Sequence, residues 1–252
     1  MPESTDHTCL ITGAASGIGA ATATLLAQTG IGRLILVDRD EAGLAALEMP
    51  AATQRFCGDV ADPDLWDRIE REARPISHAV LAAGIADSSP IADLDFAAWR
   101  QLMAVNLDGL LLSLRCAMRA MADCGGSIVV VGSAAGVRAE PGTAAYGASK
   151  AAAHHLVRVA AREGAPLGIR VNAIAPGGVD TPIWDAVPFF AELVARNAGD
   201  RAAAMAAMGA MATPLGRYAS ADEIAGQIAF LLFDQAATIT GSVLVSDGGY
   251  TA

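Results

Sequence analysis

The chain has 252 residues, of which 53% are hydrophobic and 17% charged, and its formal net charge is −10. This length suits one large α/β domain spanning residues 1–252, and so apolar a composition excludes a disordered chain. The sequence has no basic stripe to bind nucleic acid, and no apolar run reaches the roughly eighteen residues of a membrane span. We therefore expect a compact protein whose partner is a small molecule, with no nucleic acid and no membrane.

The N-terminal segment 1–8 is polar and runs directly into an apolar strand, which leaves no room for a signal peptide. We therefore expect a cytoplasmic protein. The cysteines have neither metal-ligand spacing nor the density of a disulfide scaffold, so we expect reduced packing residues and no metal site. They are Cys9, Cys57, Cys116 and Cys124.

Residues 9–30 predict an apolar strand, a glycine-rich turn and an Ala-rich helix. The turn contains Gly13, Gly17 and Gly19, which permit positive φ and the close approach of a ligand. The N-terminus of the following helix offers free N–H groups and a favourable dipole to phosphate. A bare strand-to-helix turn also uses one or two glycines, so the alternative to a pyrophosphate site is an empty turn.

Asp38 ends the second predicted strand, 33–38, nineteen residues after Gly19. In dinucleotide-binding units, an acid about twenty residues further on accepts hydrogen bonds from the adenosine ribose. The alternative is an Asp that caps a turn or helix. The spacing favours ribose binding, and it favours NAD because the carboxylate would repel a 2′-phosphate. Arg39 is the complication, because a basic residue there can accommodate the phosphate of NADP.

The next segments predict a third strand at 53–60, a helix at 63–73 and a fourth strand at 76–84. A long helix follows at 95–122, with Asn106 at its middle among apolar residues. Burying an Asn is costly without partners. Asn106 therefore either caps a local bend or serves a site.

Ser133 directly follows a buried fifth strand at 127–132, so its hydroxyl should emerge at the carboxyl end of the sheet, where open α/β sheets bind ligands. Tyr146 and Lys150 lie four residues apart at the start of a predicted helix and therefore share one face. A cation beside a phenol favours the phenolate, so this pair could transfer a proton near neutral pH. The alternative is a packing Tyr and a solvated Lys.

A sixth strand at 168–176 stops at Pro176, and a last strand follows at 242–246. Between them, residues 183–213 are either a packed helix pair or a mobile lid over the substrate. The adjacent His154 and His155 point in different directions from their helix, so we expect surface or interface residues rather than a metal pair. The alternation of strands and helices predicts a single-domain, Rossmann-like, doubly wound parallel sheet of about seven strands with helices on both faces.

With these segments in order, the whole chain resembles the short-chain dehydrogenase/reductase family. The resemblance lies in the turn Thr12-Gly13-Ala14-Ala15-Ser16-Gly17-Ile18-Gly19, the pair Asp59-Val60, the mid-helix Asn106, the set Ser133, Tyr146 and Lys150, and the loop Pro176-Gly177 with Thr181. One departure is visible: the usual Asn-Asn-Ala-Gly of the family is Leu81-Ala82-Ala83-Gly84. The two missing amides normally tie the central sheet together, so we expect a different hydrogen-bond arrangement there.

The resemblance implies an NAD-dependent oxidoreductase that interconverts a secondary alcohol and a ketone by hydride transfer, and a homotetramer. Tyr146 would act as acid and base, Ser133 would hold the substrate oxygen, Lys150 would lower the Tyr146 pKa and bind the nicotinamide ribose, and Asn106 would support a water chain. The implied coenzyme-binding residues are Gly13, Ser16, Gly17, Ile18, Gly19, Asp38, Arg39, Asp59, Val60, Ala83, Gly84, Tyr146, Lys150, Pro176, Gly177, Val179 and Thr181. The alternatives are a non-catalytic nucleotide-sensing protein on the same fold, or a dehydratase or epimerase with bound coenzyme.

The expected substrate site lies beside Tyr146, between the small residues 134–137 and the segment 183–213. Its apolar cover would come from Trp184, Phe189, Phe190, Met205, Met208 and Met211, which favours a cyclic or aryl-bearing alcohol. The polar candidates nearby are Arg138, Glu140 and Asp180; the alternative for each is a solvated loop residue, which we favour for Arg138. The rival substrate is a sugar or sugar acid held by Glu140 and Arg138. The candidate substrate-binding residues are Ser133, Ala135, Glu140, Tyr146, Gly178, Trp184 and Phe189.

Overall fold

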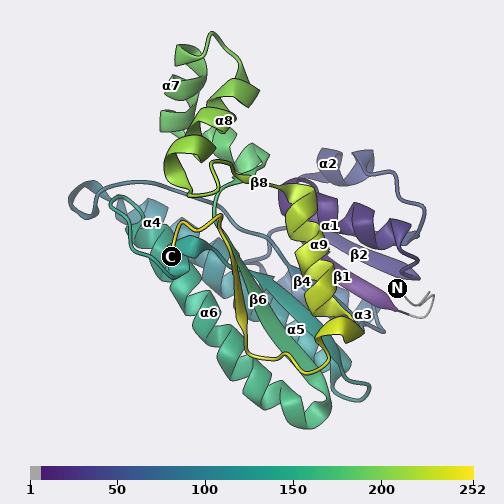
Figure 1. The fold of residues 1–252 in the computed structure, drawn as a ribbon. Helices are drawn as coiled ribbons and strands as arrows, with labels where there is room; N and C mark the ends of the chain where they lie inside the picture. The colour runs from purple at the N-terminus through teal and green to yellow at the C-terminus, as the bar shows by residue number, and fades with distance from the viewer. Residues whose placement is uncertain (1–6) are drawn as a thin grey trace.

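The computed structural model describes residues 7–252 and shows a parallel sheet between two layers of helices (Figure 1). The sheet has seven strands in the order β3-β2-β1-β4-β5-β6-β9, and every neighbouring pair is parallel. The strands are β1 Thr8–Thr12, β2 Arg33–Asp38, β3 Ala52–Cys57, β4 His78–Leu81, β5 Gly126–Val131, β6 Ile169–Pro176 and β9 Val243–Ser246. The strand order reverses between β1 and β4, where open α/β sheets bind their ligands. The predicted fold is therefore confirmed.

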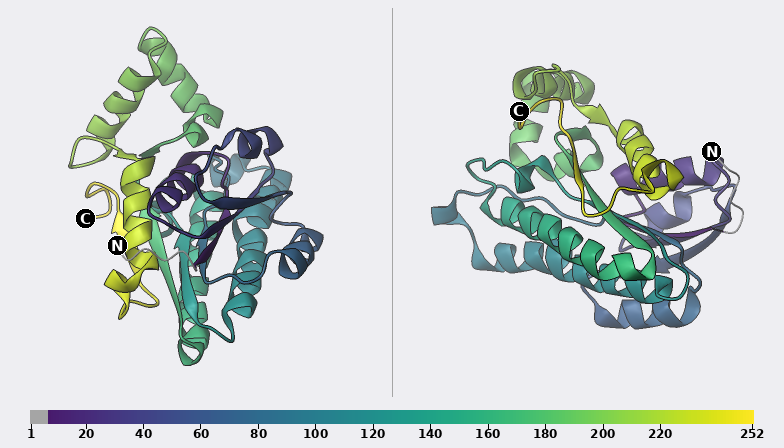
Figure 2. Two further views of the ribbon diagram at one scale, coloured as in Figure 1. Left: turned by 90° about the vertical axis from the view of Figure 1, so that its right-hand side faces the viewer. Right: turned by 60° about the horizontal axis from the view of Figure 1, so that its bottom comes forward.

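Helices cover both faces of the sheet (Figure 2). One face packs against α1 and α9, and the other against α3, α5 and α6. The helices are α1 Gly17–Gln28, α2 Glu41–Ala46, α3 Pro63–Glu72, α4 Phe96–Met103, α5 Gly109–Met121, α6 Ala144–Gly164, α7 Pro188–Arg196, α8 Arg201–Ala212 and α9 Ala221–Leu232. Successive strand residues belong to opposite cores: Leu10 packs in one apolar cluster and Ile11 in the other. Both faces of the central strands are therefore buried in apolar cores.

The α7–α8 pair projects from the carboxyl edge of the sheet, where it follows β6 (Figure 1). A short two-stranded sheet lies at its base, formed by β7 Val179–Asp180 and β8 Ala219–Ser220. α9 begins after β8 with a capping box, in which Ser220 accepts from the Glu223 N–H and the Glu223 carboxylate accepts from the Ser220 N–H. The base of the projecting pair is thus fixed to the main body.

The helix expected at 95–122 is divided in the structure. A π-helical segment, Ala104–Asp108, separates α4 from α5. Asn106 lies in this segment with 3% of its surface exposed, and its amide is fully used. Its Oδ1 accepts from the Ile85 N–H at 2.8 Å, and its Nδ2 donates to the Ile85 carbonyl at 2.9 Å and to the Ser149 Oγ at 3.2 Å. The expected local irregularity is therefore confirmed, and the Asn106 amide joins the chain after β4 to α6.

The two adjacent histidines have different environments. His155 is exposed, as expected, but His154 is buried, with 3% of its surface exposed. The surface position expected for His154 was wrong, because the inward face of α6 continues from Lys150 to the residue four positions later.

The cysteines also differ in their burial. Cys9 and Cys116 are buried packing residues, as expected, whereas Cys57 and Cys124 are exposed. Within residues 7–252 no group of His, Cys, Asp and Glu is arranged to hold a metal ion. Over the same residues, none of the helices has both the length and the apolar character needed to cross a bilayer.

His78 generates a prediction about acid stability. Its ring is buried beside His7 and Phe233, and burial, His7 and Arg170 lower its pKa from 6.5 to about 4. Because the unfolded chain binds the proton more readily, the contribution of a neutral His78 to folding is complete above pH 6.5 and is lost as the pH falls toward 4.

We expect the free energy of unfolding to fall from pH 7 to pH 5, and to fall by about 2 kcal/mol less in His78→Gln than in the native chain. Urea titrations at both pH values measure this. His155→Gln, at an exposed position, is the matched control and should keep the native pH dependence. An unchanged pH dependence in His78→Gln would contradict the assignment.

Candidate active site

Ser133, Tyr146 and Lys150 meet at the carboxyl edge of the sheet. Ser133 follows β5, and the other two lie in the first turns of α6. Lys150 is 6% exposed; its Nζ donates to the Val131 carbonyl at 3.0 Å and lies 5.7 Å from the centroid of the Tyr146 ring. The structure therefore brings together the three residues that the sequence singled out.

The Ser133 side chain is fixed by its own loop. Its backbone is extended, and the short 3₁₀ turn Ala134–Gly136 begins directly after it. Its Oγ accepts from the Ala135 N–H at 3.1 Å and is also hydrogen-bonded to the Tyr146 phenol. The two hydroxyls form the polar centre of the site.

Burial controls the protonation of this cluster. Desolvation raises the pKa of Tyr146, and the bond to Ser133 opposes this in part. Burial also lowers the pKa of Lys150 to about 8. The expected lowering of the Tyr146 pKa by Lys150 was wrong, because the ammonium donates to the Val131 carbonyl and desolvation of the phenolate dominates.

The turn between β1 and α1 forms a tight cradle. Gly13 and Gly17 have φ values of 67° and 54°, which favour glycine. A Cβ at Gly13 would lie 2.8 Å from the Ala83 nitrogen, and one at Gly19 would lie 2.0 Å from the Gly13 oxygen. Ser16 caps α1 without a side-chain hydrogen bond, so the first N–H groups of the helix face the turn without that partner. This arrangement suits a pyrophosphate.

Asp38 lies beside the same turn, at the end of β2. Its Oδ2 accepts from the Ala15 N–H at 3.0 Å, and its Oδ1 accepts from the Asp40 N–H at 3.1 Å. These bonds fix the carboxylate beside the turn, and an acid after the second strand is the group that accepts from the adenosine ribose in dinucleotide-binding units. Arg39 is exposed next to it. The residues of this edge therefore fit a dinucleotide.

Two further loops close on the turn from distant parts of the chain. A Cβ at Gly17 would touch the Thr181 side chain at 3.4 Å, and one at Gly177 would lie 2.9 Å from Asp247. Pro176 ends β6 and Val179 begins β7, so this loop runs directly into the projecting helices. The residues expected on the nicotinamide side thus lie beside those expected on the phosphate side.

Asp59 and Val60 lie on the loop that follows β3. The Asp59 carboxylate accepts from the Ala61 N–H at 2.9 Å, and Val60 is buried. The Val60 carbonyl accepts from the indole of Trp66 at 2.8 Å, and its side chain touches the position of Gly109. These bonds fix the loop against α3 and α5.

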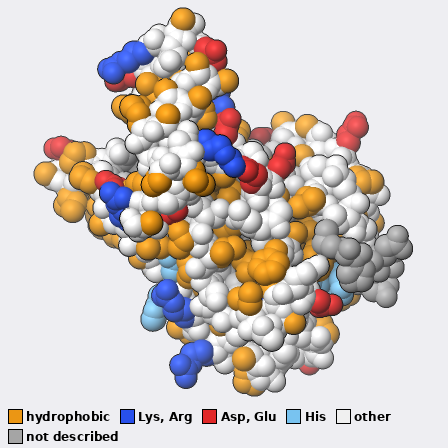
Figure 3. Space-filling view, in the orientation of Figure 1, with side chains coloured by type: hydrophobic (Ala, Val, Ile, Leu, Met, Phe, Trp, Pro, Cys, Tyr) orange, Lys and Arg blue, Asp and Glu red, His pale blue; other side chains and the backbone are white. Residues whose placement is uncertain are grey.

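The expected apolar cover from α7 and α8 is only partly present (Figure 3). Phe190, Met205 and Met208 are buried in a small core of the helix pair itself. Phe189 and Met211 were expected to face the substrate, but they are 57% and 72% exposed. Because the pair is short and isolated, its inward residues are used to hold its two helices together.

Trp184 and Gly178 lie at the base of the helix pair. The Trp184 indole donates to the Val179 carbonyl at 2.8 Å and stacks on Tyr218, with ring centroids 5.7 Å apart. A Cβ at Gly178 would lie 2.3 Å from the Tyr218 ring. Tyr218 was not singled out in the sequence, although an aromatic shortly before the cap of α9 lies close to this edge.

The polar candidates at this edge form partly exposed ion pairs. Arg138 forms a 3.0 Å ion pair with Glu140 and stacks on Tyr250, with its guanidinium 4.6 Å from the ring centroid. Asp180 forms a 2.7 Å ion pair with Arg201 of α8. Tyr250 and Arg201 were missed in the sequence. Tyr250 could have been found, because it follows a glycine turn after the last strand and so lies at this edge.

Similar proteins identify the family. The model described as enoyl-(acyl carrier protein) reductase matches residues 13–251. The cis-4-hydroxycyclohexanecarboxylate dehydrogenase of Sinomonas cyclohexanicum is 40% identical over 256 residues, covering 98% of this chain and 97% of that protein. The chain belongs to the short-chain dehydrogenase/reductase family.

Two further comparisons agree with this membership. The galactitol 2-dehydrogenase (L-tagatose-forming) of Cereibacter sphaeroides is 40% identical over 250 residues, covering 96% of this chain and 93% of that protein. The solved structure of levodione reductase has a TM-score of 0.86 and 32% identity, and covers 98% of both chains. The chain is therefore an oxidoreductase of the short-chain dehydrogenase/reductase family.

In this short-chain dehydrogenase/reductase, the segment that stands in place of the Asn pair is bonded to a neighbouring strand. The Thr12 hydroxyl of β1 accepts from the Ala82 N–H at 3.1 Å and the Ala83 N–H at 3.2 Å. The next residue, Gly84, leaves little space: a Cβ there would lie 3.3 Å from the Asn106 Oδ1 and 3.4 Å from the Lys150 Nζ. The strands β1 and β4 are thus joined where they diverge, without the two amides.

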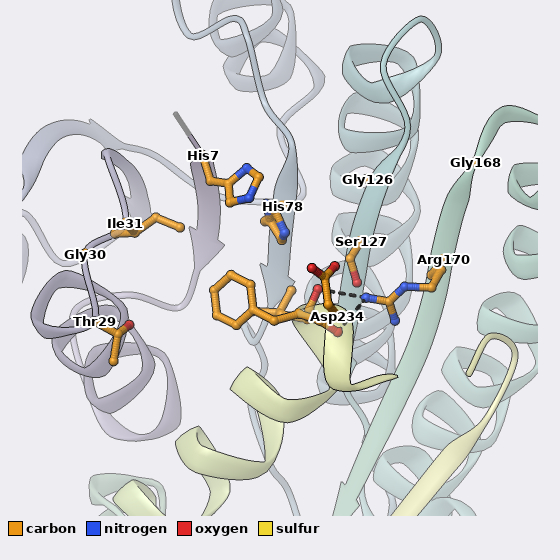
Figure 4. Close-up of a pocket in the computed structure, with 12 residues that line it drawn as sticks. His7, Thr29, Gly30, Ile31, His78, Gly126, Ser127, Gly168, Arg170 and Asp234 are labelled. Carbon is orange, nitrogen blue, oxygen red and sulfur yellow. Dashed lines mark hydrogen bonds between the residues drawn. The ribbon is translucent and has the colours of Figure 1, made fainter. Parts of the chain in front are cut away.

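A cavity of about 270 Å³ opens at the opposite edge of this short-chain dehydrogenase/reductase (Figure 4). His78, Gly126 and Arg170 line it, and they lie at the amino ends of β4, β5 and β6. The Arg170 guanidinium donates to carbonyls at the end of α9, including those of Leu231 and Leu232, each at 2.8 Å. The cavity therefore lies away from Ser133, Tyr146 and Lys150 and does not contribute to their chemistry.

Proposed function

We propose that this protein is an NAD-dependent oxidoreductase that interconverts a cyclic secondary alcohol and its ketone, with Tyr146 as the acid and base. The observation that supports this most is the buried cluster of Ser133, Tyr146 and Lys150 beside the glycine cradle. A nucleotide-sensing protein would need the cradle but not a phenol hydrogen-bonded to a serine.

The proposed roles follow from the contacts of each residue. The Ser133 hydroxyl is held by the Ala135 N–H and bonds the Tyr146 phenol, so both oxygens can converge on one substrate oxygen. Tyr146 then takes the proton from the alcohol during oxidation and returns it during reduction. A bound nicotinamide supplies the hydride chemistry. Lys150 orients the phenol and contacts the ribose. Asn106 fixes Ile85 and Ser149, which are the sequence neighbours of Gly84 and Lys150.

NAD is the proposed coenzyme because of where the Asp38 carboxylate lies. Two backbone N–H groups already hold it beside the turn, so it is placed to accept from both ribose hydroxyls. A 2′-phosphate would face this fixed negative charge. Arg39 is exposed and is the residue through which NADP would be accepted instead.

The proposed substrate class rests on the Trp184–Tyr218 stack, which offers a flat apolar wall at the base of the helix pair. A relative named for a hydroxycyclohexanecarboxylate supports a cyclic alcohol. The second candidate is a sugar or sugar alcohol. The polar group of Arg138, Glu140 and Tyr250, together with a relative named for galactitol, favours it. In either case residues 183–213 form the proposed lid.

The proposed assembly is a homotetramer, in the cytoplasm. Figure 3 shows apolar side chains on the face formed by α9 and β9, where Phe230 and Val245 are exposed. A second apolar set lies on α5 and α6, where Leu111 and Val159 are exposed. A tetramer with twofold symmetries needs two separate self-complementary faces, and these two sets supply them.

Tyr146→Phe should lose turnover by about 10²–10⁴-fold and still bind NAD, because it removes the proton carrier and leaves the cradle intact. Steady-state kinetics and NAD titration by fluorescence measure the two effects. Lys150→Ala loses two proposed contacts and should therefore lower turnover and also weaken NAD binding. Full activity in Tyr146→Phe would exclude the assignment.

Asp38→Ala should lower kcat/KM with NAD by about 10–100-fold and raise it with NADP, because a charged acceptor is lost while Arg39 remains. The control is Asp40→Ala, whose carboxylate binds the Gly43 N–H and should not alter the coenzyme preference. Comparable efficiency of the native protein with both coenzymes would show that Arg39 dominates.

A panel of cyclic secondary alcohols, sugars, sugar alcohols and hydroxy acids, assayed for NAD reduction, tests the substrate class. We expect the highest kcat/KM with cyclic alcohols. Activity confined to sugars or sugar acids would favour the second candidate and leave the dehydrogenase proposal standing.

Light scattering at micromolar concentration should give four times the 25.6 kDa mass of the chain. The double variant Leu111→Glu, Val159→Glu should reduce that mass, because it places charges in one of the two apolar faces. A native chain that runs as a monomer contradicts the proposed assembly.

A further inference from the structure

His154 lies buried beneath the loop that carries Ser133. It is on α6, one turn after Lys150, and the Ser133 N–H donates to its Nε2 at 3.5 Å. Its ring also hydrogen-bonds the Gly136 backbone. The imidazole thus contacts Ser133 at the start of the loop and Gly136 at its end.

The loop is shaped around this ring. A Cβ at Gly132 would lie 2.2 Å from the His154 Nε2, and a Cβ at Gly136 would lie 2.8 Å from its Cε1. Both glycines have ordinary φ values, so close neighbours rather than the backbone conformation exclude side chains there. At Gly132 the nearest neighbour is the His154 ring, and at Gly136 the ring acts together with the Lys150 backbone carbon, 2.7 Å from a Cβ. Gly132 is anchored on its other side, where its N–H donates to the Ile174 carbonyl at 2.7 Å.

The imidazole is kept neutral. Burial, with Lys150 and Arg158 on either side along α6, lowers its pKa from 6.5 to about 4. A neutral ring whose Nε2 accepts from Ser133 carries its proton on Nδ1, so it serves the loop as acceptor and donor at once. A protonated ring would lose the acceptor.

We propose that His154 is a positioning residue that holds the Ser133 loop, and hence the Ser133 hydroxyl, in register with Tyr146. This rests on the proposed function, because it assigns Ser133 to the substrate oxygen. The dinucleotide cradle lies on β1 and β2 and has no contact with this imidazole among those described. His154 therefore acts on turnover rather than on coenzyme binding.

The test compares His154→Leu, which fills a similar volume without an acceptor, with His154→Gln, which restores polar atoms. His155→Leu on the same helix is the matched control, because His155 is exposed. With the best alcohol of the panel, we expect His154→Leu to lower kcat by about 10–100-fold with the KM for NAD unchanged. His154→Gln should recover most of the loss, and His155→Leu should match the native protein.

A double-mutant cycle with Ser133→Ala separates positioning from a general packing role. If His154 acts through Ser133, His154→Leu should lower kcat by less than about threefold in the Ser133→Ala background. An equal fold loss in both backgrounds, native kcat in His154→Leu, or a matching rise in the KM for NAD would overturn the proposal.

Nitrogen-15 NMR of the histidine rings tests the same contact without turnover, and it distinguishes failure of this inference from failure of the proposed function. His154 should show the Nδ1–H form and stay neutral at pH 5.5. A normally titrating His154 would refute the inference even if the protein oxidises alcohols. The expected NMR result in a protein without alcohol turnover would retain the contact but remove its catalytic meaning, and so would overturn the positioning role.

Discussion

The buried ammonium of Lys150 is the constraint on which the site depends. An ammonium away from water costs several kcal/mol unless nearby groups replace its hydration, and here the Val131 carbonyl and the Tyr146 ring do so. These contacts fix α6 against the end of β5. They also limit the neighbouring positions: Gly84 has no space for a side chain in front of Nζ, and His154, one turn further on, is kept neutral beside the cation.

A second constraint is the close approach of loops from distant parts of the chain. The loop after β1 touches the chain after β4 at Ala83 and the loop after β6 at Thr181, and the turn after β9 touches Gly177. Only residues without bulky side chains allow these four segments to meet in this way. The small residues that look like a phosphate motif in the sequence are therefore also the residues that let the carboxyl ends of non-adjacent strands form one surface.

The sequence predicted those features that depend on local pattern. Alternating strands and helices, and the positions of Ser133, Tyr146 and Lys150 after their elements, follow from periodicity and from the carboxyl-edge rule. It did not predict which face of α6 carries His154, because neighbouring residues of an Ala-rich helix are equally apolar. The exposure of Phe189 was not predicted for a similar reason, because tertiary packing decides which face of the lid helices is buried. The π segment at Asn106 depends on contacts with Ile85 and Ser149, which are distant in sequence.

Burial and a nearby cation have opposing effects on the pKa of Tyr146. Proximity of a cation favours a phenolate, but burial opposes both charges, raising the pKa of Tyr146 and lowering that of Lys150. The cluster therefore favours a neutral phenol beside an ammonium, whose own pKa of about 8 keeps it protonated at neutral pH. A phenolate needs hydrogen-bond donors beyond Ser133. Lys150 is the group that can provide one, because its flexible stem can turn Nζ from the Val131 carbonyl toward the phenol oxygen once another acceptor replaces that carbonyl. The pKa of Tyr146 is thus set by the balance between desolvation, which raises it, and the hydrogen-bond donors that reach the phenol oxygen, which lower it.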